Sequence, residues 1–171
     1  MKKILPVLIC AICLATSASA QKYAIIDTKY ILSKIPDYVD ADKKLLAVSD
    51  QWQKEIDDNQ SALDLMYKNY DAEQYMLSDE LKKKREDELF NKEKELRDLQ
   101  KRRFGYQGDL FKEREKLVKP IQDKVYNAVQ KMAVAKGFDF ILDKSEGITV
   151  IFADPKLDHS NDVLLTMGIK N

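Results

Sequence analysis

Beyond its first 20 residues the chain contains no cysteine, because Cys10 and Cys13 both lie in that segment. A disulfide framework and a thiolate metal site are therefore excluded for residues 21–171. The single histidine, His159, lies in a polar linker, with no second histidine or cysteine to complete a metal site or a nucleophilic triad. A glycine-rich phosphate loop is also missing. We predict no catalytic, cofactor-binding or metal-binding residues, and expect no cofactor and no enzymatic activity.

Long apolar runs are missing too, apart from Ile4 to Ala15. That run follows two lysines and precedes Ala18-Ser19-Ala20, a pattern typical of a cleaved secretory signal. It is shorter than the roughly 20 residues that span a bilayer. A lipoprotein signal is the competing interpretation, but isoleucines precede both cysteines, where a small residue is needed. We predict a signal peptide over residues 1–20, cleaved after Ala20.

Neither sign of charge dominates the remaining residues. Without Lys2 and Lys3, 27 lysines and arginines face 29 aspartates and glutamates, a formal charge of −2. Such a balance provides no overall attraction to nucleic acid or to anionic membranes. We therefore expect no nucleic-acid partner.

Regular apolar spacing, by contrast, is abundant between Pro36 and Ala135. Two runs of residues with alternating steps of three and four each predict an apolar stripe along one helix face. The first run is Leu45, Ser49, Trp52, Ile56, Asn59, Leu63, Met66 and Tyr70. The second run is Leu89, Lys92, Leu96, Leu99, Arg103, Tyr106, Leu110, Glu113 and Leu117. The remaining positions are rich in charge, so we predict two antiparallel helices in a hairpin.

The predicted turn of this hairpin, Asp71–Leu77, has neither the glycine nor the proline of an ordinary turn. Apolar and aromatic side chains gather there instead: Met66, Tyr67, Tyr70, Tyr75 and Met76. One interpretation is that the last helical turns pack against each other. The other is an exposed, adaptable contact surface, for which methionine and tyrosine are well suited.

The second helix is expected to begin after Ser78, which can cap it, and to run from Asp79 to about Lys119. Gly105 and Gly108 lie in its middle and mark either a flexible point or a weak place held by the partner helix. Pro120 should kink the helix, because it lacks the amide that would bond the carbonyl of Lys116.

Strand-like sequence occurs near both ends of the chain. We predict strands at Tyr23–Asp27, Phe138–Asp143 and Ile148–Ala153, the last two forming a β-hairpin, and a short helix from Asp162 to about Met167. These strands are too few to close a sheet, and unpaired strand edges favour pairing with another chain. An oligomer assembled through this β body is therefore expected.

Together these segments resemble the Skp/OmpH family of periplasmic chaperones, over essentially all of residues 21–171. The resemblance is carried by Ile25-Ile26-Asp27, Ile35-Pro36-Asp37-Tyr38, Leu77-Ser78-Asp79-Glu80, Val118-Lys119-Pro120-Ile121, Lys136-Gly137-Phe138-Asp139-Phe140-Ile141-Leu142-Asp143 and Phe152-Ala153-Asp154-Pro155. It implies an α+β fold in which a long coiled-coil hairpin, or tentacle, is inserted in a small β body. In the family, three β bodies join into a barrel, and unfolded outer-membrane β-barrel proteins are held between the tentacles without ATP.

The resemblance thus implies a periplasmic homotrimer, with a β body of residues 21–35 and 120–171 and a hairpin of residues 36–119. The client-binding candidates are Met66, Tyr67, Tyr70, Tyr75 and Met76. The trimer-interface candidates are Ile25, Ile26, Phe140, Ile141, Val150 and Ile151. Well-known members are strongly basic, whereas this chain is near neutral, which argues against charge-driven contact with lipid or lipopolysaccharide. The alternative function is a structural or adaptor coiled coil of the cell envelope.

Overall fold

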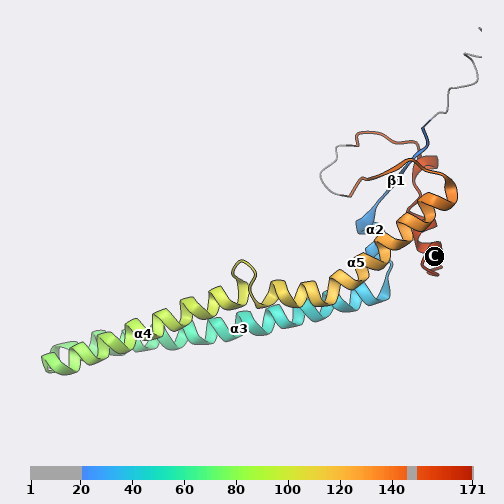
Figure 1. Ribbon diagram of the computed structural model, residues 1–171. Helices are drawn as coiled ribbons and strands as arrows, with labels where there is room; N and C mark the ends of the chain where they lie inside the picture. The colour runs from blue at the N-terminus through green and yellow to red at the C-terminus, as the bar shows by residue number, and fades with distance from the viewer. Residues whose placement is uncertain (1–20, 146–149, 171) are drawn as a thin grey trace, which may run out of the picture. The chain divides into compact units, whose positions relative to one another are not determined.

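The structure is a computed structural model, and it describes residues 21–145 and 150–170. The predicted signal peptide, residues 1–20, lies outside the described residues, as do residues 146–149 and 171. The chain divides into two units (Figure 1). Leu32–Val125 forms the hairpin unit, and the segments that end at Ile31 and begin at Tyr126 form the end unit.

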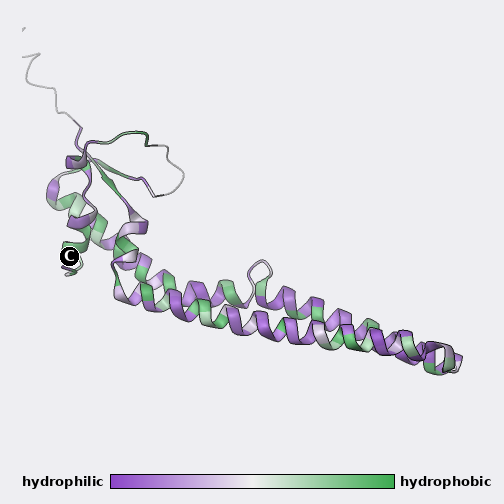
Figure 2. Ribbon diagram, turned by 180° about the vertical axis from the view of Figure 1, so that it is seen from behind, coloured by the Kyte–Doolittle hydropathy of each residue, from purple (hydrophilic) through white to green (hydrophobic). Residues whose placement is uncertain are grey.

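The hairpin unit is built on two long helices, α3 (Pro36–Glu73) and α4 (Asp79–Phe104). A short 3-10 turn, η1 (Gln74–Met76), joins them, and they run side by side in Figures 1 and 2. The predicted cap is confirmed, since the Ser78 hydroxyl accepts a hydrogen bond from the amide of Leu81. Purple and green residues alternate along both helices in Figure 2, as expected for amphipathic helices whose other faces lie in water.

Apolar packing between the two helices confirms most of the predicted stripes. A buried cluster forms between them, with Met66 and Tyr70 packed against it; its members are Ile56, Leu63, Leu89, Leu96 and Leu99. Each of these side chains is at most 8% exposed. Burial of this kind contributes roughly 1.5–3 kcal/mol per large aliphatic side chain. The stretch of the hairpin that contains this cluster is called the packed stretch below.

The prediction of one continuous helix from Asp79 to Lys119 is wrong. The helix ends at Phe104, and a new helix, α5 (Asp109–Lys136), begins after a four-residue loop. The loop stands out from the helix pair in Figure 1. Its conformation requires glycine, because a Cβ on Gly105 would lie 2.3 Å from the carbonyl oxygen of Lys101. Gln107 in the same loop has a φ of 55°, in the left-handed region that favours glycine.

The loop also changes which residues face inward. Tyr106, expected in the apolar stripe, is 96% exposed. Beyond the loop the buried residues of the hairpin unit are Val118, Ile121 and Val125, whereas the last three residues of the predicted stripe, Leu110, Glu113 and Leu117, are only half-buried. The loop therefore shifts the register of the second half of the hairpin relative to the first.

Pro120 does not end the helix, since α5 continues through it to Lys136. The proline is exposed, and its missing amide removes one hydrogen bond without ending the helix; the kink predicted there stays a prediction. The predicted stop at Gly137 is confirmed: its φ is 69°, and the amide of Phe138 bonds the carbonyl of Ala133 at 3.0 Å. Both features belong to a Schellman-type helix end.

The end unit contains a two-stranded parallel sheet of β1 (Tyr23–Ile26) and β2 (Phe140–Asp143). Tyr23 pairs with Phe140 and Ile26 with Asp143. Its other elements are α2 (Thr28–Ser33), the last turns of α5, η2 (Pro155–Leu157) and α6 (Ser160–Thr166). The largest fully buried side chains of this unit are Ile31, Val163 and Leu164.

The predicted β-hairpin is wrong in its described part. Residues 150–153 form no strand, and residues 146–149 of the predicted turn and strand lie outside the described residues. β2 pairs instead with β1, in parallel. Parallel pairing buries Ala24, Ile25 and Ile26 against the helices, which a local hairpin of two later strands would not do.

Candidate functional site

The aromatic and methionine side chains at the hairpin turn separate into two groups. Tyr75 and Met76, both on η1, are 88% and 80% exposed. Met66 and Tyr70, on the last turns of α3, pack against the buried cluster instead. Met66 and Tyr70 therefore pack as the first interpretation expects, and Tyr75 and Met76 have the exposure that the second requires, while their role as a contact surface stays a prediction. The exposed pair, Tyr75 and Met76, is called the tip pair below.

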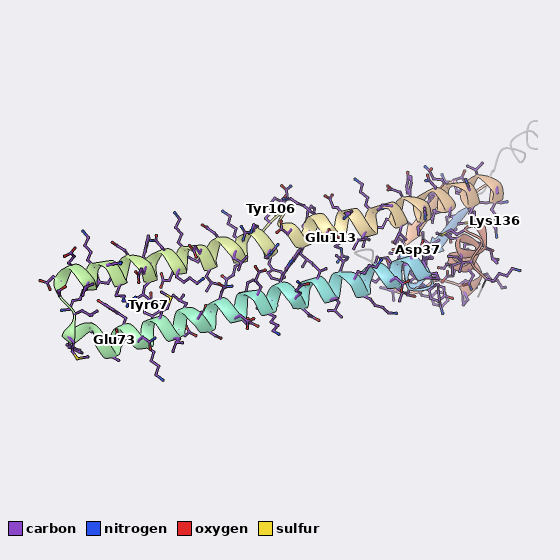
Figure 3. All side chains as sticks on the ribbon, turned by 90° about the horizontal axis from the view of Figure 1, so that it is seen from below. Asp37, Tyr67, Glu73, Tyr106, Glu113 and Lys136 are labelled. Carbon is purple, nitrogen blue, oxygen red and sulfur yellow. The ribbon has the colours of Figure 1, made fainter. Side chains whose placement is uncertain are left out.

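Tyrosine hydroxyl groups tie the end of α3 to α4. Tyr67 donates a 2.5 Å hydrogen bond to Glu93, and Tyr70 donates one of the same length to Glu86. The bond from Tyr67 holds the pKa of the Glu93 carboxyl below its ordinary value, and each carboxylate raises the pKa of its tyrosine partner. Figure 3 shows Tyr67 and Glu73 near the end of the hairpin and Tyr106 at the loop. Tyr67 and Tyr70 thus brace the turn that carries the tip pair.

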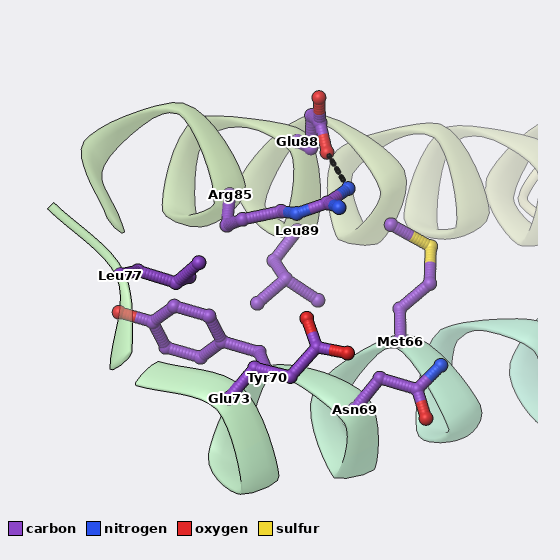
Figure 4. Close-up of a pocket in the computed structure, with 8 residues that line it drawn as sticks. All are labelled: Met66, Asn69, Tyr70, Glu73, Leu77, Arg85, Glu88 and Leu89. Atoms are coloured by element: carbon purple, nitrogen blue, oxygen red, sulfur yellow. Dashed lines mark hydrogen bonds and ion pairs between the residues drawn. The ribbon is translucent and has the colours of Figure 1, made fainter. Parts of the chain in front are cut away.

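A small cavity lies between these braced turns (Figure 4). Its volume is about 120 Å³, and its lining includes Met66, Tyr70, Leu77 and Leu89. An ion pair between Arg85 and Glu88, 3.0 Å long, borders it. A cavity this small has no room for a drug-sized ligand, which takes about 300 Å³ or more. We interpret it as a packing gap of the helix pair.

Asn59, Lys92 and Arg103, three of the polar residues in the predicted stripes, make contacts across the hairpin. The Lys92 amine donates to the Asn59 side-chain oxygen at 3.0 Å. Arg103 bonds Glu55 of α3 at 3.1 Å and Asp109 of α5 at 2.9 Å. Its guanidinium also lies 4.7 Å from the centre of the Trp52 ring. Asn59 and Lys92 occupy positions of the two predicted runs on opposite helices, but sequence analysis did not predict that they pair.

An open groove beside the α4–α5 loop was also missed. Its volume is about 530 Å³, and residues from α3, α4, the loop and α5 line it. The apolar part of its lining includes Leu46, Phe104, Leu110 and Phe111. We call this the loop groove. The pair of glycines three residues apart was the only sign of it in the sequence.

The predicted trimer-interface residues of the end unit differ widely in exposure. Ile25 and Ile26 are each 4% exposed, so both already belong to the core of the single chain. Ile141 and Val150 are half-buried, and Phe140 is 44% exposed. Ile151 is 93% exposed.

Two aromatic residues outside the six interface candidates are also exposed in this unit. Phe152 is 84% exposed, next to Ile151. Tyr23 is 43% exposed and stacks on Phe140, with ring centres 5.6 Å apart. We call the set Tyr23, Phe140, Ile151 and Phe152 the apolar edge of the end unit.

Carboxylates in the end unit hold its loops and helices together. Asp143 accepts hydrogen bonds from the amide and hydroxyl of Thr28 and from the amide of Ser145. Partial burial acts to raise the pKa of Asp143, but these bonds together lower it below its ordinary value. Asp162 bonds Lys136 at 2.6 Å and His159 at 2.5 Å, and chiefly the lysine lowers its pKa.

Asp143, Asp162 and His159 thus have structural contacts within the end unit. Within residues 21–145 and 150–170, no three histidine, aspartate or glutamate side chains are placed to hold a metal ion. The described helices also include none that combines the length and apolar content needed to cross a bilayer.

Comparisons with known proteins agree with this architecture. The model of the family described as outer membrane protein (OmpH-like) matches residues 22–167. None of the curated proteins compared with the chain matches it significantly. A solved structure from Caulobacter crescentus, proposed to be an OmpH-like outer membrane chaperone, superposes with a TM-score of 0.66 at 16% identity. The superposition covers 88% of this chain and 86% of that one, and at such low identity it shows a common fold. Because the family model matches most of its length, the chain belongs to the OmpH-like outer membrane protein family.

Proposed function

We propose that the protein is an ATP-independent holdase chaperone of the periplasm, which binds unfolded outer-membrane β-barrel proteins and prevents their aggregation. Membership of the OmpH-like family and the likeness to a proposed chaperone support this role. In this proposal the protein binds clients and performs no chemistry on them. The near-neutral charge of residues 21–171 is in keeping with client contacts that are mainly apolar.

The tip pair is the observation that carries the proposal. Tyr75 and Met76 present almost their entire side chains to solvent at the end of a hairpin braced by Tyr67 and Tyr70. A large exposed apolar side chain gains free energy only when another apolar surface covers it. A flexible methionine beside a tyrosine can fit many sequences, which a holdase requires. A rigid spacer coiled coil would instead favour polar residues at its tip.

The binding test uses residues 21–171 and a urea-denatured outer-membrane β-barrel protein diluted into buffer without ATP. The parent chain should suppress aggregation of the client. Changing Tyr75 and Met76 together to serine should weaken client binding by about 1–3 kcal/mol, as expected when two exposed side chains lose part of their burial in the complex. Phe90, which is 60% exposed on α4, provides a matched control: Phe90→Ser should bind client like the parent.

A parent chain that leaves client aggregation unchanged would contradict the proposal and favour the structural coiled coil. Full activity of the Tyr75→Ser, Met76→Ser variant would show instead that clients bind elsewhere on the chain.

We further propose that three copies assemble through the end unit. Within the described residues, no strand pairs with the outer edge of β2, whereas the outer edge of β1 already forms a bridge from Ile25 to Asp158. An unpaired strand edge favours pairing with another chain, and Phe140 on β2 is one of the exposed apolar residues of this unit. Ile151→Asp should dissociate the trimer and leave each chain folded, because Ile151 is 93% exposed in the single chain. Ile26→Asp should unfold the end unit itself. If light scattering shows that the parent chain is a stable monomer, the proposed assembly is refuted.

A further inference from the structure

We propose that the loop groove is a second client site, which binds one extended segment whose apolar residues alternate with charged residues of both signs. This inference rests on the proposed holdase function. The site lies in the part of the hairpin beside the α4–α5 loop, which we call the open stretch. Along the chain, α4 separates it from the tip pair.

The apolar side chains of the groove come from three helices. Leu46 of α3 is 64% exposed, Phe104 of α4 is 38% exposed and Phe111 of α5 is 46% exposed. A volume of about 530 Å³ is several times that of the cavity in the packed stretch. Several large side chains of an incoming segment could occupy it at once.

The chain itself does not fill this groove, for a reason visible in the backbone. The loop interrupts the helix between the end of α4 and the start of α5. Tyr106, which lies in this loop, is 96% exposed. Ala or a larger residue cannot replace Gly105 in this conformation, since its Cβ would meet the carbonyl oxygen of Lys101. The opening is therefore built into the local backbone and is not a gap that a side-chain rotation would close.

Charges at the groove fit a mixed-charge occupant. Asp42 of α3 and Arg114 of α5 both line it, and neither takes part in an ion pair within the described part of the chain. Strands of outer-membrane barrels alternate lipid-facing apolar residues with polar residues. Such a segment can place apolar side chains on Leu46 and Phe111 while its charged residues reach Asp42 and Arg114.

The loop backbone also offers hydrogen bonds to an extended chain. In the described structure the amides of Tyr106 and Gln107 donate no backbone hydrogen bond, although Gly108 bonds Gly105 at 2.8 Å. An extended segment has unpaired backbone groups along its whole length, and main-chain bonds of this kind contribute to peptide recognition. A helical segment has satisfied these groups internally and would gain nothing from the loop.

A labelled variant tests the groove with defined peptides. Residues 21–171 contain no cysteine, so Tyr106→Cys gives a single site for an environment-sensitive fluorophore. The probe is a 13-residue peptide that alternates leucine or tyrosine with lysine or glutamate. Its control has the same composition with the apolar residues every third or fourth position. We expect the alternating peptide to bind at least ten times more tightly, and a label at Phe90→Cys to report no binding.

Charge preference provides a second measurement on a variant that keeps the apolar lining. Arg114→Glu makes both charged residues of the groove acidic, so binding should shift by about tenfold toward a peptide whose charged positions are all lysine. Equal binding of the alternating and control peptides, or an unchanged charge preference, would overturn the inference.

The client assay separates this inference from the proposed function. Leu46→Ser with Phe111→Ser should weaken client binding about fivefold to tenfold, while circular dichroism of the variant matches the parent. If this variant binds client like the parent and the tip variant does not, the groove site is wrong and the holdase function stands. If the parent binds no client, the holdase function fails and the groove site fails with it.

Discussion

Two stretches of the same hairpin differ in how they use similar residues. In the packed stretch, Ile56 and four leucines of α3 and α4 bury one another to 8% exposure or less. Beside the α4–α5 loop, the stripe residue Tyr106 is 96% exposed and the stripe residue Leu110 is only half-buried. Apolar residues are present in both stretches, so apolar content alone does not determine packing. The difference lies in helix continuity, because an unbroken helix keeps its stripe facing the partner and an interrupted one does not.

Arg103 lies where the two stretches meet. It contacts α3 through Glu55 and Trp52 and reaches across the loop to Asp109, the first residue of α5. These contacts hold the end of α4 and the start of α5 to the same point on α3. The comparison between the packed and open stretches therefore suggests four experiments.

The largest effect should come from replacing one leucine in each stretch with alanine. Leu96→Ala empties part of the buried cluster and should cost about 2–5 kcal/mol of local stability. Leu110→Ala, at a half-buried position lining the loop groove, should cost less than half as much. Native-state hydrogen exchange of the α4 and α5 amides measures both. Equal losses would show that the two stretches are packed alike.

The second-largest effect should come from replacing Arg103, which lies where the two stretches meet. Arg103→Ala removes the charge-assisted hydrogen bonds to Glu55 and Asp109 and the contact with Trp52. The loss of local stability should be on the order of 2 kcal/mol. Arg103→Lys keeps the charge but not the forked geometry, so it should recover only part of this loss. Exchange should accelerate at residues 100–112 and remain unchanged around Leu63. Full rescue by lysine would mean that charge alone matters there.

The loop glycines should have a smaller effect. Alanine at Gly105 and Gly108 would place Cβ atoms 2.3 and 2.8 Å from backbone oxygens, so the loop must distort, at a cost of about 1 kcal/mol or more. Gln107→Gly is the matched control, since glycine relieves the positive φ and should slightly stabilise the loop. Both changes can be followed by exchange over residues 101–109. A more stable double-alanine variant would show that a continuous helix fits this position after all.

The smallest effect is a dependence on pH in the packed stretch. The hydrogen bond from Tyr67 lowers the pKa of Glu93, so it stabilises the fold above the unfolded glutamate pKa of about 4.3. This contribution to stability is lost as the pH falls through the lower pKa that Glu93 has in the folded protein. In urea unfolding, the parent should therefore be more stable than Tyr67→Phe at pH 7. This difference in the free energy of unfolding should shrink near pH 3. A difference that stays constant with pH would exclude this bond as its source.

Local sequence signals predicted the helix ends well. Ser78 caps α4, and Gly137 ends α5 in the left-handed region, because each signal acts through the residue's own hydrogen bonds or backbone freedom. The loop at Gly105–Gly108 was missed because two glycines are also tolerated in a helix held by a partner. Whether the helix breaks depends on the register of α3 opposite, which spacing along one helix does not reveal.

Strand pairing and exposure were harder to predict. A hairpin of neighbouring segments is the simplest pairing of two late strands, but β2 pairs with β1, more than a hundred residues earlier. The candidate residues at the turn were identified as a group, and the structure separates Tyr75 and Met76 from Met66 and Tyr70. Stripe spacing already placed Met66 and Tyr70 toward α4, and nothing in the sequence showed that Tyr75 and Met76 would be exposed.

The parallel pairing of β1 with β2 also affects the order in which the chain folds. β1 is made early, yet its partner strand follows the whole of the hairpin unit. Closing so long a loop is slow compared with forming contacts between α3 and α4. We therefore expect the hairpin to form first and the sheet to close last. A chain emerging from a translocation pore would then have a folded hairpin before it could complete the end unit.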